Sequence, residues 1–283
     1  MDIKTIDIQS REFPDSLRNI PNPPTKLYYA GNIGLLASAG IAIVGTRRCS
    51  PYGRWVSYEL GRKLAECGCT VISGMAEGID TQAHLGCLDR GGNTIAVLGT
   101  GVNICFPKSN YKLYERILKD GLLISEIEPD EKAAPWTFPA RNRIISGLSR
   151  GVVVVEGAIK SGSMITANHA LDQGREVFAV PGNINQPNSI GTNMLIRDGA
   201  TPILGIEEAP KLLGIEDKTG KWSNYTFSRS EKLIIGCMEV FSGISAEEVA
   251  FRCDMAIGEV MGLLSALELK NVIYDDGNSY YLT

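Results

Sequence analysis

The sequence lacks the cysteine pattern of a disulfide-rich or zinc-binding protein. Its cysteines number seven, no two are spaced C-x-x-C, and there are only two histidines, His84 and His169. Disulfide frameworks and structural zinc sites need paired or clustered ligands. We therefore expect reduced, mostly buried thiols, no metal and no resident cofactor.

Long apolar runs are also missing. No stretch approaches the roughly 18 apolar residues that a membrane-spanning helix needs, and the first residues, MDIKTIDIQS, contain no apolar core of a signal peptide. These absences predict a cytoplasmic protein without a membrane partner.

Charge is present but unevenly distributed. The chain has 283 residues, of which 44% are hydrophobic and 21% charged, as in ordinary globular proteins. Residues 1–230 carry 25 basic and 23 acidic side chains (+2), whereas residues 231–283 carry 3 and 9 (−6), which together give the net charge of −4. The two parts are predicted to have different partners.

Six short apolar runs, each followed by a turn rich in Gly or Ser, recur from residue 41 onward. They are IAIVG (41–45), TVISG (70–74), TIAVLG (94–99), LLISE (122–126), VVVVE (152–156) and EVFAVPG (176–182). Continuous apolarity is typical of strands covered on both faces. With helices expected at about 52–66, 78–88, 111–119, 141–148 and 164–173, the pattern predicts a Rossmann-like, doubly wound α/β domain over residues 40–206, with a mostly parallel sheet of six or seven strands.

The flanking segments predict three further parts. Residues 1–39 are rich in proline, with one strand candidate at 27–30, and are expected to pack on the sheet edge. Residues 207–230 are polar and are predicted to be a linker. Residues 231–283 show three helix-like stretches and then the turn DDGN between VIY and YYL, which predicts a small winged-helix domain.

Ligands of an open parallel sheet bind beyond the carboxyl ends of its strands. The turns there contain many small residues whose N–H groups could face an anion, and they contribute Arg47, Arg48, Lys108, Arg141, Arg143 and Lys160. A phosphate ligand is therefore expected. The turn GTRRCSPYG has neither the G-K-[ST] of a Walker loop nor the G-x-G-x-x-G of a dinucleotide site, so a mononucleotide, a dinucleotide and a polynucleotide backbone all stay open.

Catalytic groups are not arranged in any recognisable way. No nucleophile, base and orienting group share a suitable spacing, and both histidines fall inside predicted helices, where a packing role is expected. Asp80 and Glu126 are interpreted as groups that orient loop backbone and arginine. The chain is not expected to be an enzyme.

Several long segments resemble the DNA-processing protein A family, also called Smf. They are IAIVGTR, VISGMAEGIDTQAH, TIAVLGTGVNICFPKSN, FPARNRIISGLSRGVVVVEG, KSGSMITANHALDQGREVFAVPG and GTNMLIRDGA, and the resemblance extends from about Phe13 to Leu204. It implies a non-catalytic protein that binds single-stranded DNA without regard to sequence. It further implies that the protein protects incoming strands, dimerises through the Rossmann-like domain and loads the RecA recombinase during natural transformation and homologous recombination, with single-strand binding protein as a further partner.

The resemblance also implies a set of DNA-contacting residues. Carried onto this sequence, the strand-binding pocket would comprise Gly45, Thr46, Arg47, Ser73, Gly74, Lys108, Arg141, Asn142, Arg143, Lys160, Ser161, Gly162 and Ser163. Arginines and oriented N–H groups grip phosphates irrespective of base, which fits the residue types. Some relatives carry a sterile-alpha-motif-like N-terminal domain, for which the residues before the first predicted sheet strand are too few.

Two rival interpretations are weaker. Rossmann-like nucleoside-monophosphate phosphoribohydrolases of the lysine-decarboxylase-like family carry an acid in the loop P-G-G-x-G-T-x-x-E, but residues 157–171 here contain no Asp or Glu. A nucleotide-sensing regulator would use its winged helix to bind promoters. Its predicted recognition helix, 256–269, contains Glu259 and Glu268 and no basic residue, so we expect that domain to contact protein instead.

Overall fold

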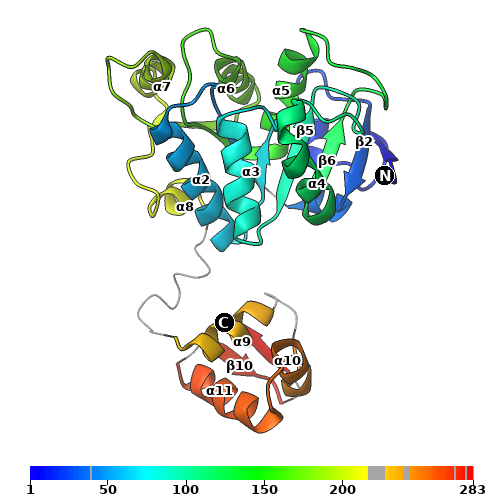
Figure 1. Ribbon diagram of the computed structural model, residues 1–283, viewed down its shortest axis with the longest axis vertical. Helices are drawn as coiled ribbons and strands as arrows, with labels where there is room; N and C mark the ends of the chain where they lie inside the picture. Colours follow the sequence, from blue (N-terminus) through cyan, green and yellow to red (C-terminus); the bar gives the residue numbers. More distant parts are fainter. Residues whose placement is uncertain (39, 216–226, 239–242, 271, 278, 283) are drawn as a thin grey trace. The chain divides into compact units, whose positions relative to one another are not determined.

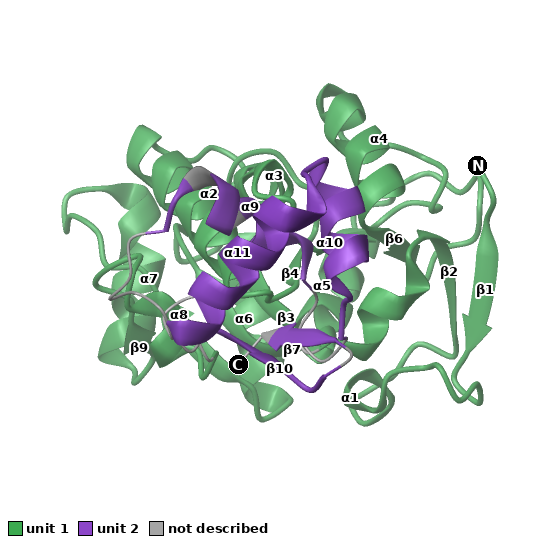
Figure 2. Ribbon diagram, turned by 90° about the horizontal axis from the view of Figure 1, so that it is seen from below, with its two compact units in different colours: residues 1–216 green, residues 217–283 purple. Residues whose placement is uncertain are grey.

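The computed structural model of the chain describes residues 1–38, 40–215, 227–238, 243–270, 272–277 and 279–282. The chain divides into two compact units, Met1–Glu216 and Asp217–Thr283, which are coloured separately in Figure 2. Each unit is described by itself. Among the described residues, no helix combines the length and apolarity needed to cross a bilayer.

The first unit is built on one sheet with the strand order β1-β2-β6-β5-β4-β3-β7-β8-β9. From β6 to β9 all neighbours are parallel, whereas β2 pairs antiparallel with β6 and β1 with β2. The strands are β1 (Lys4–Asp7), β2 (Lys26–Gly31), β3 (Gly40–Val44), β4 (Val71–Ser73), β5 (Thr94–Leu98), β6 (Leu122–Ser125), β7 (Ser149–Val154), β8 (Glu176–Ala179) and β9 (Thr201–Pro202).

Helices cover both faces of this sheet (Figure 1). One face carries α2 (Pro51–Glu66), α3 (Ile79–Asp89), α4 (Tyr111–Asp120) and α8 (Ala209–Leu212), and the other carries α1 (Asp15–Arg18), α5 (Thr137–Leu148), α6 (Gly162–Asp172) and α7 (Pro187–Arg197). Side chains alternate between the two layers: in β3, Ile41 and Ile43 face α2 and α3, whereas Ala42 and Val44 face the opposite layer. Burial on both sides explains why the strands appear in the sequence as unbroken apolar runs.

The predicted doubly wound α/β fold is confirmed, and so is the expected number of strands, since residues 40–206 contribute the seven strands β3 to β9. The sheet of the described chain has nine strands, because residues 1–38 add β1 and β2, followed by the short 3-10 helix η1 (Ile33–Ala37). Helix α7 is absent from the helices expected from the sequence, because the segment PGNINQPNSIGTN (181–193) is rich in turn residues. It starts with Pro at its first position, where the missing N–H costs nothing.

The second unit has the predicted order of elements. Helices α9 (Arg229–Cys237), α10 (Ala246–Cys253) and α11 (Ile257–Leu269) precede the hairpin of β10 (Ile273–Asp275) and β11 (Tyr280–Leu282), and Ile244 bridges Tyr280 beside it. Its separate apolar core includes Ile234, Val249, Val260, Leu264 and Leu267. Of the predicted linker 207–230, residues 216–226 lie outside the described residues, while α8 packs Ala209 into the core of the first unit.

Helices α2 and α3 pack with their backbones in direct contact at two glycines. A Cβ atom on Gly86 would lie 2.0 Å from the carbonyl oxygen of Tyr58, and one on Gly61 would lie 2.3 Å from that of Ala83. Neither distance is sterically possible, so any side chain would force the helices apart. This contact holds the amino end of α3, and the loop before it, close to the end of β3.

Replacing Gly86 by Ala is therefore expected to destabilise the first unit by about 1–3 kcal/mol through overpacking. The matched control is Gly262→Ala in α11, a helical glycine whose added Cβ would meet nothing within 4 Å. That change is expected to stabilise its own unit by up to about 1 kcal/mol, because Ala is the better helix former. Urea unfolding of both variants measures the difference, and equal behaviour of the two would contradict the packing argument.

Candidate functional site

A crevice of about 680 Å³ lies at the carboxyl ends of the parallel strands. It is lined from three directions: by the loop after β3 (residues 45–48), by the amino-terminal part of α5, and by the start of α6. Strands β3 and β7 are neighbours, yet the chain leaves β3 toward β4 and returns to β7 only after β6. The crevice therefore occupies the topological switch point, where open α/β sheets bind their ligands.

The loop after β3 is held in place by backbone contacts. Thr46 N donates to the carbonyl oxygen of Glu156 (2.8 Å), and Ile79 N donates to that of Thr46 (3.3 Å). Gly78 has a φ of +81°, and a Cβ there would lie 2.4 Å from Thr46 O, so only glycine lets the loop rest on the start of α3. The sequence prediction that Gly45, Thr46 and Arg47 line the pocket agrees with this placement.

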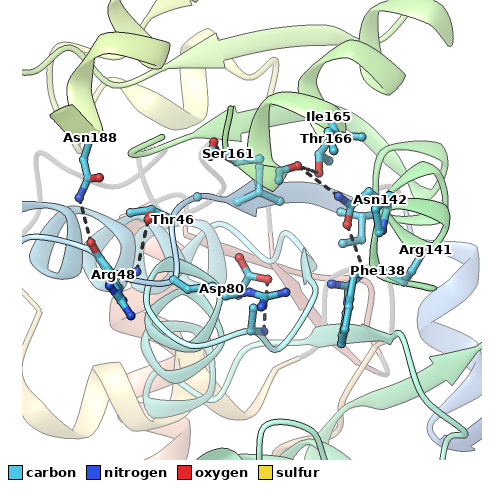
Figure 3. A pocket seen from close by; sticks show the side chains of 18 of the residues that line it. Thr46, Arg48, Asp80, Phe138, Arg141, Asn142, Ser161, Ile165, Thr166 and Asn188 are labelled. Atoms are coloured by element: carbon cyan, nitrogen blue, oxygen red, sulfur yellow. Dashed lines mark hydrogen bonds between the residues drawn. The ribbon is translucent and has the colours of Figure 1, made fainter. Parts of the chain in front are cut away.

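Two arginines of this loop present free charge to the crevice. Arg47 and Arg48 are exposed and line it, and within the described residues neither forms a salt bridge. The Arg47 guanidinium lies 5.1 Å from the centre of the Phe138 ring, and Asn188 Nδ2 donates to the carbonyl oxygen of Arg48 (2.8 Å). Figure 3 shows Thr46, Arg48 and Asn188 at one end of the crevice and Phe138 and Asn142 at the other.

The amino terminus of α6 supplies the facing wall. Ser161, Gly162 and Ser163 line the crevice, and the first turn of the helix contains no acidic residue. Its first N–H groups have no intrahelical partner, and the helix dipole adds partial positive charge there. Asn142 Nδ2 donates to Gly162 O (3.2 Å), which fixes α5 against this turn. The arrangement is suited to an anion such as phosphate.

Arg141 is a buried part of the crevice wall. Its Nη1 donates to the carbonyl oxygens of Gly74 (2.7 Å) and Val97, at the ends of β4 and β5. A Cβ on Gly74 would lie 2.5 Å from this guanidinium, so the glycine leaves room for it. Burial lowers the pKa of Arg141 to about 10, partly opposed by the nearby charge of Asp80, so the group stays protonated at neutral pH.

Arg143 does not line the crevice with Arg141. Side chains two residues apart on a helix project in nearly opposite directions. Arg143 instead pairs with Glu126 (2.6 Å) and donates to the carbonyl oxygens of Asn22 (2.9 Å) and Ala140 (3.0 Å). It ties α5 to the N-terminal segment, so the interpretation of Glu126 as an orienting group for arginine is confirmed.

The remaining predicted residues lie around the crevice. Gly74 lines a small adjoining pocket, and Ser73 is buried, with its hydroxyl donating to Ile43 O (2.6 Å). Lys108, in the 3-10 helix η2 (Lys108–Asn110), and Lys160 are exposed and outside the lining. Arg48, which the sequence analysis named among the basic residues of the turns, also lines the crevice, and the lining includes residues that it did not name, among them Phe138, Ile165, Thr166 and Asn188. Phe138 lies close to Arg141 and Arg143 in the sequence, and an aromatic residue among arginines is a signal of nucleic-acid binding that could have indicated it. Asn188 lies in α7, a helix that the sequence did not predict.

The model of a family described as DNA recombination-mediator protein A matches residues 4–214. The chain belongs to this family. The match covers the first unit and the whole crevice, and the winged helix lies beyond it.

Relatives named DNA processing protein DprA or protein Smf are similar to much of this chain. DNA processing protein DprA of Bacillus subtilis is 44% identical over 207 residues, or 73% of this chain and 70% of the relative. DprA of Streptococcus pneumoniae is 45% identical over 188 residues, 66% of either chain. Protein Smf of Escherichia coli is 43% identical over 204 residues, which are 72% of this chain and 54% of that protein.

Two solved structures of the family share the fold. The X-ray structure of DNA processing protein A from S. pneumoniae superposes with a TM-score of 0.72 at 40% identity, over 75% of this chain and 74% of that one. A structure of DNA processing protein A from Helicobacter pylori, described as giving insight into its single-stranded DNA binding mode, superposes with a TM-score of 0.69 at 32% identity. The match covers 75% of this chain and 96% of that one.

Two buried carboxylates near the crevice, Asp80 and Glu156, hold backbone groups in place. Asp80 Oδ2 accepts from Gly74 N (3.1 Å) and Ala76 N (3.3 Å), which confirms its interpretation as an orienting group, and burial raises its pKa. Glu156 accepts from Ser50 N (2.9 Å) at the amino end of α2. The described residues contain no group of three or more His, Cys, Asp or Glu side chains able to hold a metal.

His84 is a packing histidine. It is fully buried, and its Nδ1 lies 2.7 Å from the Thr94 hydroxyl, which itself donates to Val71 O. Nδ1 therefore carries the proton, and Nε2 has no hydrogen-bond partner among the described residues. Burial lowers the pKa of His84 to about 3, so the folded protein holds it neutral.

This burial predicts a pH dependence of stability. Below pH 6.5, the ordinary histidine pKa, the unfolded chain binds a proton on His84 that the folded protein takes up only near pH 3. Stability should therefore fall with decreasing pH across this window, by about 1.4 kcal/mol per pH unit from this group. The variant His84→Gln should lose this contribution to the pH dependence of stability, and the control variant His169→Gln should retain it.

Urea unfolding at a series of pH values measures the effect as the difference between each variant and the wild type. The difference is the readout because Asp80, whose pKa is raised, contributes with the opposite sign in the acid range. Identical slopes for wild type and His84→Gln would contradict the assignment.

Proposed function

We propose that the chain is a non-catalytic, sequence-independent single-stranded DNA-binding protein that protects incoming strands and loads the RecA recombinase in natural transformation and homologous recombination. Family membership supports the proposal, as does the single-stranded DNA binding mode described for the similar H. pylori protein. RecA, a second copy of this chain through the Rossmann-like domain and single-strand binding protein are the proposed partners.

The observation that carries the proposal is the unpaired positive charge in the crevice. Arg47 and Arg48 face the acid-free start of α6 across the switch point. Such groups neutralise backbone phosphates without reading bases, which gives salt-dependent binding with no sequence preference from the phosphate contacts.

The rival hydrolase has no support at the place where its acid would lie. Residues 157–171 contain no Asp or Glu, and the nearest buried carboxylate, Glu156, is bound to Ser50. His84 is buried and neutral. A general acid or base must reach the substrate, and none of these groups is free to do so.

The winged-helix unit is proposed to contact protein. Its α11, in the position of a recognition helix, exposes Glu259 and Glu268 and contains no basic residue. Like-charge repulsion between these acids and DNA phosphates opposes duplex binding. The unit is therefore assigned to the protein partners of the complex.

Arg47→Ala is expected to weaken binding of a short single-stranded oligonucleotide about tenfold at moderate salt. Because one phosphate contact is lost, the slope of log affinity against log salt concentration should become shallower by about 0.7. Fluorescence anisotropy titrations at several salt concentrations measure both quantities.

Arg197→Ala is the matched control, since Arg197 is a 69% exposed arginine at the end of α7 and outside the crevice. Its affinity and salt slope should equal those of the wild type. If both variants bind like the wild type, the crevice is not the DNA site.

The proposal also predicts no nucleotide hydrolysis. Nucleoside monophosphates incubated with concentrated protein should release no free base, as followed by chromatography over time. Release that scales with protein concentration would establish the phosphoribohydrolase activity instead.

A further inference from the structure

Two cysteines of the second unit lie with their sulfur atoms in contact. Cys237 is the last residue of α9 and Cys253 the last of α10, and their Sγ atoms are 3.6 Å apart. Both side chains pack at the edge of the apolar core of this unit. Each is half-buried, so neither thiol is sealed inside the core as Cys67, Cys69 and Cys87 of the first unit are. A small oxidant can therefore reach the pair.

The hydrogen bonds of the pair set the direction of each sulfur. The Cys253 thiol donates to the Cys237 sulfur, and the Cys237 thiol donates in turn to the carbonyl oxygen of Ile234 (3.0 Å). A lone pair of the Cys237 sulfur therefore faces Cys253. Burial, and next the neighbouring Cys253 thiol, raises the pKa of Cys237 to about 11. Because a thiol attacks an oxidant as its thiolate, Cys237 is a poor first nucleophile, which leaves that step to Cys253.

The ends of the two helices are tied to each other. Arg252 Nη1 donates to the carbonyl oxygen of Cys237 (3.2 Å), which holds the end of α10 on the end of α9. The sulfurs of a disulfide are about 2.05 Å apart, so the two sulfurs must approach each other by about 1.5 Å to form one. Both cysteines end their helices, where the backbone adapts more readily than in a helix interior. The arrangement thus permits a bond without repacking of the core.

We propose that Cys237 and Cys253 are a reversible oxidation site, at which a peroxide converts the two thiols into a disulfide within the second unit. The Cys253 thiolate attacks one oxygen of hydrogen peroxide, the O–O bond breaks, and a sulfenic acid forms. The hydroxide released becomes water by taking up the proton that Cys253 had lost.

The second step joins the two sulfurs. The Cys237 sulfur attacks the sulfenic sulfur of Cys253, the S–O bond breaks, and hydroxide leaves with the Cys237 proton as a second molecule of water. The two thiols lose two electrons, which the peroxide gains. A dithiol reductant reverses the change by thiol–disulfide exchange.

The disulfide links two helices through a loop that runs from residue 237 to residue 253. Such a cross-link restricts the unfolded chain, so the oxidised unit is the more stable one. The unit is proposed to contact protein, and oxidation fixes α10 on α9 for that contact. The crevice lies in the first unit, so oxidation should leave the affinity for single-stranded DNA unchanged.

The experiment treats the reduced full chain with hydrogen peroxide, blocks the remaining thiols with N-ethylmaleimide and identifies the products by mass spectrometry of the protein and its peptides. The wild type should lose two of its seven free thiols, with a bridge between the peptides of Cys237 and Cys253. Dithiothreitol should restore all seven. Calorimetry should show the transition of the oxidised second unit moved upward by about 10 °C.

Serine variants separate the two steps. Cys237→Ser should stop the reaction after the first step, so that dimedone captures a sulfenic acid on Cys253. Cys253→Ser should give much slower capture on Cys237. The matched control is Cys105→Ser, since Cys105 is a half-buried thiol of the first unit whose sulfur donates to the carbonyl oxygen of Pro107 (3.3 Å). This control should form the bridge as the wild type does.

Retention of all seven thiols by the peroxide-treated wild type overturns the oxidation site, and so does a bridge that forms between other cysteines instead. Equal rates of dimedone capture in Cys237→Ser and Cys253→Ser overturn the order of the two steps. An unchanged transition of the second unit in bridged protein overturns the stabilising effect. None of these results bears on strand binding, which is measured on reduced protein.

Discussion

The anchoring of Arg141 beneath the crevice is the interaction on which the rest of the site depends. One guanidinium joins α5 to the carbonyl oxygens of Gly74 and Val97, at the ends of two neighbouring strands. The Asp80 carboxylate accepts a hydrogen bond from the backbone N–H of Gly74, at the end of β4, and its charge stabilises the buried Arg141 cation. Since Phe138 and Asn142 lie on the same helix, this one buried charge sets the position of both.

The site therefore separates two uses of positive charge. Arg141 and Arg143 hold α5 in place. Arg141 bonds to the sheet, and Arg143 bonds to Glu126 and to the N-terminal segment. Arg47 and Arg48 remain free because their loop is secured by its own backbone, with Gly78 making room beneath it. A rigid wall with a few uncommitted cations binds a flexible polyanion at small entropic cost, because only the ligand must be ordered.

Much of the fold could be predicted from the sequence, because strands buried on both faces are unbroken apolar runs. Each of the six predicted runs overlaps a strand, and helices lie between the runs. The helix α7 could not be recognised, since its Pro, Asn, Ser and Gly are also typical of turns. The crevice lies at the carboxyl ends of the strands, where the sequence predicts a ligand. The directions of Arg141 and Arg143 could not be predicted, because they depend on which face of α5 meets the sheet.

The crevice is closed by contacts between parts of the chain that are distant in sequence. Asn188 reaches back across 140 residues to the carbonyl oxygen of Arg48, and Thr46 is bonded to the strand end at Glu156. On the ribosome, the loop with the free arginines therefore emerges long before the residues that fix it. The crevice is completed only once the start of α7 has been synthesised, so a shorter nascent chain carries the charges without the completed crevice.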